Sequence, residues 1–387
     1  MPKDAIKFIK DDDEGILPYC EEEDAEKFYF QQLLTARFSW GSNKATPHKS
    51  SPLRLRDIRR MVMLKVKSGM FEESGKSHAS PKISSMVIAF LCVFLVIYLF
   101  EAIVPTILTL KPLMEEFEKM GYQAGEKISF AESMRAANKV SAPPAVMIPT
   151  LISTVFGTII SMMYCRFGEM RKLSSMGVRK KNLVPHYLIG LVIGIVLMTA
   201  IVLLSALFGA QKITFRSDVN YGLIGLFWIG WFIQGMSEEF IFRGYLMNSV
   251  GGKHSVILAL SISSAAFSLA HAANPGFSFI VFVNLALFAV FAGMYMILTD
   301  DIWGTSAIHS IWNCTQGNLY GISVSGTNEV ESVMKTVASS DSKLLTGGDF
   351  GIEGSIFTTV VLLAATALVY WQMKKKGIVE IVENAKG

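Results

Sequence analysis

Cysteine is scarce in this sequence, and the spacing of the cysteines argues against a disulfide framework and against a zinc site built from cysteines. The 387 residues include only four cysteines: Cys20, Cys92, Cys165 and Cys314. No two of them form a Cys-x-x-Cys pair, so we expect neither a disulfide framework nor a cysteine zinc motif. The His-Glu-x-x-His helix of many zinc proteases is also missing. The N-terminus lacks the pattern of a secretory signal, so we expect later apolar helices to drive membrane insertion.

Charged residues are also few, at 18% of the chain, whereas apolar residues make up 51% and the mean hydropathy is +0.41. These values exceed what a soluble domain needs to fill one core. The net charge of +4 is unevenly spread, with acidic runs at 11–13 and 21–23 and basic residues from 44 to 67. We therefore expect a polar N-terminal tail followed by a chain that lies mostly in lipid.

Long apolar runs separated by short polar joints follow Pro81. Because about 20 apolar residues cross the hydrocarbon of a bilayer, the pattern predicts an all-α, polytopic membrane helix bundle with about eight transmembrane helices. The expected spans are 84–108, 144–165, 187–209, 221–247, 256–273, 277–298, 303–321 and 355–373. The fifth and seventh contain many polar residues, which suits helices buried within a bundle.

Lysine and arginine in the joints predict the orientation. They crowd the tail, the joint after the second span and the segment after the eighth span, which lie on one side of an eight-span bundle. We expect an integral protein of the bacterial cell membrane with both termini cytoplasmic. Its predicted parts are a cytoplasmic tail (1–80), a transmembrane core (81–321), a flexible extracytoplasmic loop (322–354) and a last transmembrane helix with a cytoplasmic tail (355–387).

The tail contains a basic amphipathic segment, residues 53–71, in which Leu, Ile and Met alternate with Arg and Lys. A helix of this kind before a first span is typical of contact with the anionic cytoplasmic leaflet, to which each basic residue contributes about 1 kcal/mol. Nothing around it resembles a nucleic-acid-binding module. The expected partners therefore include membrane lipids and exclude nucleic acid.

Ionisable residues within the later spans are the strongest functional signal. The fourth span contains Glu238, Glu239 and Arg243, the fifth His271, and the seventh His309. A charged side chain at the bilayer centre costs at least about 2.5 kcal/mol on insertion scales, so each is a functional candidate. Taken alone, the two glutamates and the arginine could equally be an interfacial charge cluster, and one membrane histidine is more often a packing residue. Their occurrence together favours a site.

Helical spacing predicts which of these side chains share a face. Glu239 and Arg243 are four residues apart, so the arginine can neutralise that carboxylate. Glu238 lies about 100 degrees round the helix and is free to face the interior of the bundle.

The two histidines each have a partner four residues away. Phe267 precedes His271, so its ring can pack over the imidazole and fix its orientation. His309 and Asn313 project from one face of the seventh span for the same reason. These spacings predict two further groups of site residues on separate helices.

Together the three motifs resemble a known family. They read Glu238-Glu239-x-x-x-Arg243, Phe267-x-x-x-His271 and His309-x-x-x-Asn313, and they follow one another within residues 221–320. Their order and spacing look like the CAAX-protease and bacteriocin-processing (CPBP) family, also called the Abi family. Its members are multi-helix membrane endopeptidases, some of which trim the last three residues from prenylated proteins, while bacterial members process peptides or protect against them.

The resemblance implies roles for four of these side chains. Glu238 with His271 would activate a water as general base, and His309 with Asn313 would stabilise the oxyanion. The chemistry is reasonable in itself, because amide hydrolysis needs an activated water, a donor for the oxyanion and a proton for the leaving amine. Each oxyanion donor is worth about 3 to 4 kcal/mol.

By the same resemblance, Glu239 and Arg243 would support the four residues that carry out the reaction. A second interpretation stays open, in which Glu238, His271 and His309 bind a catalytic zinc and leave a fourth position free. We favour metal-independent chemistry on the grounds of the resemblance, so no cofactor is firmly implied.

Three functional hypotheses follow for the whole chain. The first is an intramembrane endopeptidase that hydrolyses a peptide bond in a peptide or a lipid-modified protein. The second is a non-enzymatic immunity or scaffold protein that keeps the fold and binds a peptide or a partner. The third is a transporter with proton-relaying Glu and His residues, although the paired repeats expected of many transporters are not evident.

Overall fold

The computed structural model describes residues 7–11, 15–19, 62–123 and 126–383. The chain divides into two units, Met1–Ile58 and Arg59–Gly387. In the first unit, strands β1 (Lys7–Asp11) and β2 (Gly15–Tyr19) form an antiparallel hairpin. The second unit is the helical bundle that contains the candidate site.

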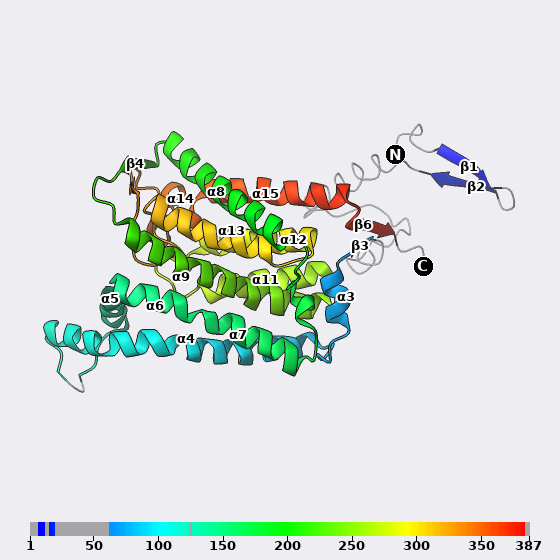
Figure 1. Cartoon of the computed structure of the whole chain (residues 1–387). Helices are drawn as coiled ribbons and strands as arrows, with labels where there is room; N and C mark the ends of the chain where they lie inside the picture. The colour runs from blue at the N-terminus through cyan, green and yellow to red at the C-terminus, as the bar shows by residue number, and fades with distance from the viewer. Residues whose placement is uncertain (1–6, 12–14, 20–61, 124–125, 384–387) are drawn as a thin grey trace, which may run out of the picture. The chain divides into compact units, whose positions relative to one another are not determined.

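The bundle consists of long helices packed side by side (Figure 1). Some continue into a π-helical turn, labelled η2, η4 or η5. The long elements are α4 (Ile83–Lys119), α6 (Pro144–Ser153), α7 (Val155–Met163) with η2 (Tyr164–Gly168), α8 (Leu183–Leu207), α9 (Tyr221–Glu239) with η4 (Phe240–Met247), α11 (Val256–Ala270), α12 (Phe279–Thr299), α13 (Trp303–Cys314) with η5 (Thr315–Leu319), and α15 (Ile356–Lys375). Shorter elements are α3 (Gly69–Gly75), η3 (Leu173–Met176), α5 (Phe130–Ser141), α10 (Asn248–Gly251), α14 (Lys343–Thr346), η6 (Gly348–Phe350) and η7 (Ile352–Gly354).

Five segments of the described chain are long and apolar enough to cross a membrane: Ile83–Lys119, Pro144–Gly168, Leu183–Leu207, Phe279–Thr299 and Ile356–Lys375. They correspond to five of the eight expected spans. The other three expected spans are also helical, but α11 has only 15 residues, and α9 and α13 carry the polar site residues. The helical membrane bundle is therefore confirmed, whereas the count of eight spans is not.

Helix α13 occupies the centre of the bundle, where every residue from Gly304 to Asn318 is buried. Glycines on the neighbouring helices permit this close packing. A Cβ added to Gly190 of α8 would lie 2.3 Å from the carbonyl oxygen of Gly304, and one added to Gly235 of α9 would lie 2.7 Å from the backbone nitrogen of Ser310. Small residues thus bring α8 and α9 into backbone contact with the helix that contains His309.

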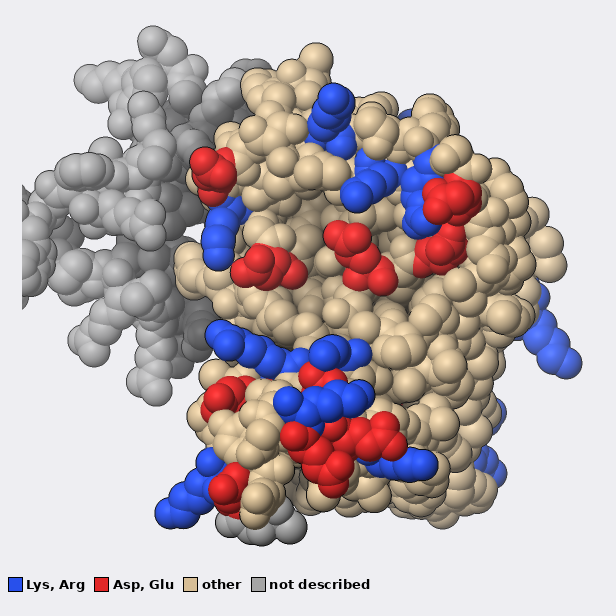
Figure 2. Space-filling view, turned by 90° about the vertical axis from the view of Figure 1, so that its left-hand side faces the viewer, with Lys and Arg blue, Asp and Glu red and all other residues tan. Residues whose placement is uncertain are grey.

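One end of the bundle is covered by a two-stranded sheet. Strand β4 (Gln211–Phe215) pairs antiparallel with β5 (Met334–Ala338), and β4 lies at the same end as α5 and α14 (Figure 1). On this face, a band of mostly uncharged surface runs between two groups of charged side chains (Figure 2). Residues 322–354 were expected to form a flexible loop, but they contain the regular elements β5, α14, η6 and η7. The extracytoplasmic location of this segment stays a prediction.

At the opposite end, β3 (Val62–Val66) pairs antiparallel with β6 (Val379–Glu383). The expected amphipathic helix over 53–71 is therefore wrong for residues 62–66, and residues 53–61 lie outside the described chain. The physical reason is a partner segment rich in Val and Ile, which favour strands. Because this pairing joins the segment before α4 to the segment after α15, both flanks of the bundle lie at the same end.

Candidate active site

The polar residues of α9, α11 and α13 meet at a cavity of about 190 Å³ inside the bundle. Apolar side chains, among them Trp231, Phe267, Phe288 and Trp312, form part of its wall. Its polar lining consists of Gln234, Glu238, His271, Asn274, His309, Asn313, Ser325, Thr327 and Glu353. A largely apolar cavity with a few convergent polar groups is the usual form of a small-molecule or catalytic site.

Glu239 is the centre of a buried polar cluster behind the cavity. Its Oε1 atom lies 2.8 Å from Nδ1 of His309 and 3.0 Å from Nη1 of Arg243. The hydroxyl of Thr305 donates to its other oxygen at 3.2 Å. The side chains of Glu239 and Arg243 are fully buried. The predicted neutralisation of Glu239 by Arg243 is therefore present in the structure, and the same carboxylate orients the ring of His309.

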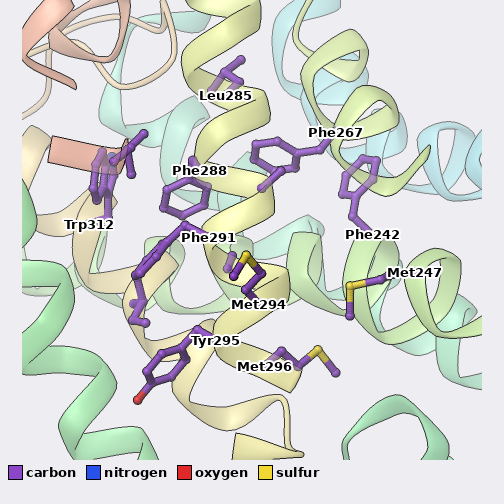
Figure 3. Close-up of a cluster of buried hydrophobic side chains, with 14 of the residues drawn as sticks. Phe242, Met247, Phe267, Leu285, Phe288, Phe291, Met294, Tyr295, Met296 and Trp312 are labelled. Carbon is purple, nitrogen blue, oxygen red and sulfur yellow. The ribbon is translucent and has the colours of Figure 1, made fainter. Parts of the chain in front are cut away.

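Aromatic rings hold this cluster in place. The guanidinium of Arg243 lies 4.4 Å from the centroid of the Phe267 ring, a cation–π contact. The Phe267 ring also lies 5.0 Å from the ring of His271, as its spacing predicts, and Phe288 meets His309 edge to face at 5.1 Å. Figure 3 shows Phe242, Phe267, Phe288 and Trp312 in succession across the interior. Both histidines are thus oriented by packed aromatic side chains.

Glu238 points into the cavity and is linked to two other helical positions. Nε2 of Gln234 donates to Oε1 of Glu238 at 2.5 Å, and Nδ2 of Asn313 donates to Oε1 of Gln234 at 2.8 Å. The Oε2 atom of Glu238 lies 3.7 Å from Nε2 of His309. This oxygen is buried and has no hydrogen-bond partner among the residues that the structure describes. Glu238 therefore presents an unpaired acceptor to the cavity.

His271 follows the last turn of α11 and lines the same cavity. Its Nδ1 lies 2.9 Å from the carbonyl oxygen of Phe267, and this hydrogen bond places the proton on Nδ1. Nε2 is then free to accept. Within the described chain no hydrogen bond joins His271 to Glu238, whereas Glu238 lies beside His309. A water between Glu238 and His271 would therefore be needed for the two to act together.

The backbone changes its winding next to the site. Helix α9 continues as the π-helical turn η4 directly after Glu239, and α13 continues as η5 after Cys314. Insertions of this kind occur often at functional sites, because they rotate the following side chains. Sequence analysis predicts one continuous helix over 221–247 and does not foresee this change.

The structure brings all six candidate site residues together. Glu238, His271, His309 and Asn313 line the cavity, and Glu239 and Arg243 lie behind it. Five polar lining residues were not predicted from the sequence: Gln234, Asn274, Ser325, Thr327 and Glu353. Gln234 had a usable signal, because it lies four residues before Glu238 on an apolar helix and shares its face. Glu353 had none, since it lies in the segment expected to be a flexible loop.

The zinc interpretation needs three ligands close to one another. Among the described residues, no group of three His, Cys, Asp or Glu side chains is placed so that it could hold one metal ion. His309 has its Nδ1 bonded to Glu239, so only its Nε2 could bind a metal ion, and this atom lies 3.7 Å from Glu238. The residues present do not fit a three-ligand zinc site.

A second hollow of about 230 Å³ adjoins the cavity and shares Leu151, Trp231, Asn274 and Thr327 with it. It extends to Pro105 of α4 and to Asn138 and Ser141 of α5. The two hollows together make a longer groove than the polar cavity alone. An extended chain can be accommodated better in such a groove than in the cavity by itself.

Comparison with known families agrees with this geometry. Residues 220–315 match the family described as type II CAAX prenyl endopeptidase Rce1-like. The match covers α9, η4, α10, α11, α12 and α13, and all six candidate residues lie within it. No curated protein and no solved structure matches the chain. Residues 220–315 thus match an Rce1-like domain, which agrees with the resemblance of the three motifs to the CAAX-protease and bacteriocin-processing family.

Proposed function

We propose that this protein is an intramembrane endopeptidase that hydrolyses a peptide bond near the end of a prenylated or otherwise lipid-modified protein. The observation that carries the proposal is the free Oε2 atom of Glu238. It is a buried carboxylate oxygen that faces a cavity beside two histidines. An unpaired buried acceptor has a high free-energy cost, so it is typical of a group that binds a water or a substrate.

In the proposed reaction, Glu238 accepts a proton from a water whose oxygen attacks the peptide carbonyl carbon. His271 offers Nε2 to the same water, since its Nδ1 proton is engaged by the carbonyl of Phe267. Collapse of the tetrahedral intermediate breaks the C–N bond, and the proton taken from the water is returned to the leaving amine. The products are a carboxylic acid and an amine, which become a carboxylate and an ammonium when the acid's proton passes to the amine.

His309 and Asn313 would stabilise the oxyanion of that intermediate. In its doubly protonated form, His309 donates Nδ1–H to Glu239 and keeps Nε2–H for the cavity. Two carboxylates lie against this ring, Glu239 at 2.8 Å from Nδ1 and Glu238 at 3.7 Å from Nε2. Asn313 has one N–H bonded to Gln234 and a second N–H free to donate. Donors fixed before the reaction stabilise the transition state most effectively.

We further propose that the end of the bundle with the paired strands β3 and β6 faces the cytoplasm. The paired strands β3 and β6 support an even number of crossings, because they bring both flanks of the bundle to one end. Lys180 and Lys181 precede α8, and Lys374 to Lys376 end the last helix. The bias of lysine and arginine towards the cytoplasm assigns this side.

The decisive experiment measures cleavage by the purified full-length protein in lipid nanodiscs. The substrates are a farnesylated peptide with a C-terminal Cys-aliphatic-aliphatic-X sequence and the same peptide without the lipid. We expect Glu238→Gln to lower kcat/KM by about 10² to 10⁴-fold, since it removes the general base. His309→Ala should lower it by about 10² to 10³-fold through loss of an oxyanion donor.

The matched control is Glu118→Gln, which changes an exposed glutamate near the end of α4 and should leave kcat/KM unchanged. Equal activity of wild type and Glu238→Gln would contradict the proposal. Tight binding of the farnesylated peptide by the wild type, with no product from either peptide, would instead favour a binding protein that keeps the fold.

A further inference from the structure

Glu353 is a buried carboxylate that reaches the cavity from outside the family-matched region. It lies in η7, 38 residues beyond the last matched position, and it is only 6% exposed. It lines the same cavity as His271 and Glu238. A charged group at this depth is rare unless it is paired or has a function.

The contacts of Glu353 hold one short segment, Ser323–Thr327, which we call the wall segment. The backbone N–H of Ser325 donates to Oε2 of Glu353 at 2.6 Å, and the Ser325 hydroxyl lies 3.2 Å from the same oxygen. Nε2 of Gln316 donates to that oxygen at 3.1 Å and to the carbonyl of Ser323 at 2.6 Å. The carboxylate thus joins η5 to the wall segment.

Two further hydrogen bonds hold the wall segment to its neighbours. Asn274 donates from Nδ2 to the carbonyl of Ser325 at 2.8 Å, and the N–H of Gly326 donates to the carbonyl of Phe350 at 2.8 Å. Gly351 has a φ of +97°, and a Cβ there would lie 2.1 Å from the carbonyl oxygen of Ser323. Only glycine permits this approach, so the turn that contains Glu353 is built against the wall segment.

Glu353 and His271 line the same cavity. Burial raises the pKa of Glu353 above its usual value, and the donors from Ser325 and Gln316 and the nearby His271 imidazole offset part of this rise. His271 has its Nδ1 proton on the carbonyl of Phe267 and its Nε2 open to the cavity. A carboxylate across the cavity stabilises the partial positive charge that this ring gains when Nε2 accepts a hydrogen bond from the attacking water.

We propose that Glu353 is a positioning residue of the cleavage site, which fixes Ser323–Thr327 as the cavity wall and places a negative charge opposite His271. The inference rests on the proposed endopeptidase function, and it adds a residue that the family-matched region does not contain. It means that the segment after α13 is part of the site and that a chain truncated after residue 320 would have an incomplete cavity.

Hydrogen exchange tests the positioning of the wall segment without reference to activity. The full-length protein in nanodiscs is compared with Glu353→Ala and Glu353→Gln by mass spectrometry of peptides that cover residues 323–327. Glu353→Ala should speed exchange there by about tenfold, since it removes the acceptor of the Ser325 amide. Glu353→Gln keeps an oxygen acceptor and should stay close to wild type. Unchanged exchange in Glu353→Ala overturns the inference.

Kinetics with the farnesylated peptide test the charge. Glu353→Gln should lower kcat by about tenfold while KM stays within about twofold, and Glu353→Asp, which keeps the charge, should recover part of the loss. The control is Asp349→Asn, an exposed acid of η6, which should change neither. If Glu353→Gln leaves kcat unchanged, or raises KM alone, then the charge of Glu353 does not act on His271, and this part of the inference is overturned. If the wild type cleaves neither peptide, the proposed function fails, and the exchange comparison still decides the role of Glu353 in holding the wall.

Discussion

Replacing Arg243 with methionine should destabilise the protein strongly, because the change leaves a buried charge without its main partner. Arg243 and Glu239 are both fully buried, 3.0 Å apart, and Arg243 also lies over the Phe267 ring at 4.4 Å. Removing one partner of a buried pair costs about 3 to 5 kcal/mol. The lost cation–π contact adds about 1 to 2 kcal/mol. The hydrogen bond from His309 to Glu239 offsets part of this cost. We expect a net loss of about 3 to 5 kcal/mol.

A double-mutant cycle separates the charge from the packing. Arg243→Met, Glu239→Gln and the double variant are unfolded in detergent micelles by titration with a denaturing detergent, followed by tryptophan fluorescence. The double variant has no unpaired carboxylate, so it should be more stable than Arg243→Met, with a coupling free energy of about 2 kcal/mol or more. The matched control is Lys111→Met, whose i,i+4 partner Glu115 is exposed and 3.9 Å away. This surface pair should contribute less than about 1 kcal/mol.

Two results would refute this reasoning. The first is a loss below about 1 kcal/mol for Arg243→Met, which is the size of a surface pair. The second is simple additivity of the two single variants, since independent sites add within about 0.5 kcal/mol. Either result would mean that Glu239 is held by its other partners and does not need the arginine.

Three further predictions concern the cavity and the packing beside it. Gln234→Leu should lower kcat by about tenfold, because it breaks the hydrogen-bonded link between Asn313 and Glu238. Steady-state kinetics check this, and we expect KM to stay close to the wild-type value. Gly235→Ala should destabilise the fold by about 1 to 3 kcal/mol through overpacking against Ser310, measured by the same detergent titration, with the exposed Gly225→Ala as control. Dialysis against a metal chelator should leave cleavage unchanged, because the described histidines and acids form no three-ligand group, and a loss reversed by added zinc would contradict this.

The parts of the site that could be predicted are those fixed within one helix. The spacing of Glu239 and Arg243 determines that they share a face, and the same argument holds for Phe267 and His271. The structure contains both contacts, at 3.0 Å and at 5.0 Å between ring centroids. Local geometry depends only on the helical repeat, so the sequence is sufficient for it.

Contacts between helices could not be predicted in this way. His309 bonds to Glu239 across α9 and α13 because Gly235 lets the two backbones approach, and spacing along the chain does not reveal which acid faces which ring. Glu353 was missed for a related reason, since its segment has the composition of a surface loop. The pairing of β3 with β6 joins residues more than 300 positions apart, and a basic stretch alone could not indicate its partner.

That pairing also affects how the molecule can be rearranged. A chain whose first and last strands of the bundle are hydrogen-bonded neighbours is close to a closed ring. Residue 383 could be joined to residue 62 by a short linker, and new ends could be opened between β4 and α9 at the exposed residues Ser217 and Asp218. Such a circular permutant would keep every helix around the cavity. It would also allow reporters to be fused at the β4 end of the bundle, opposite the paired strands β3 and β6 (Figure 1).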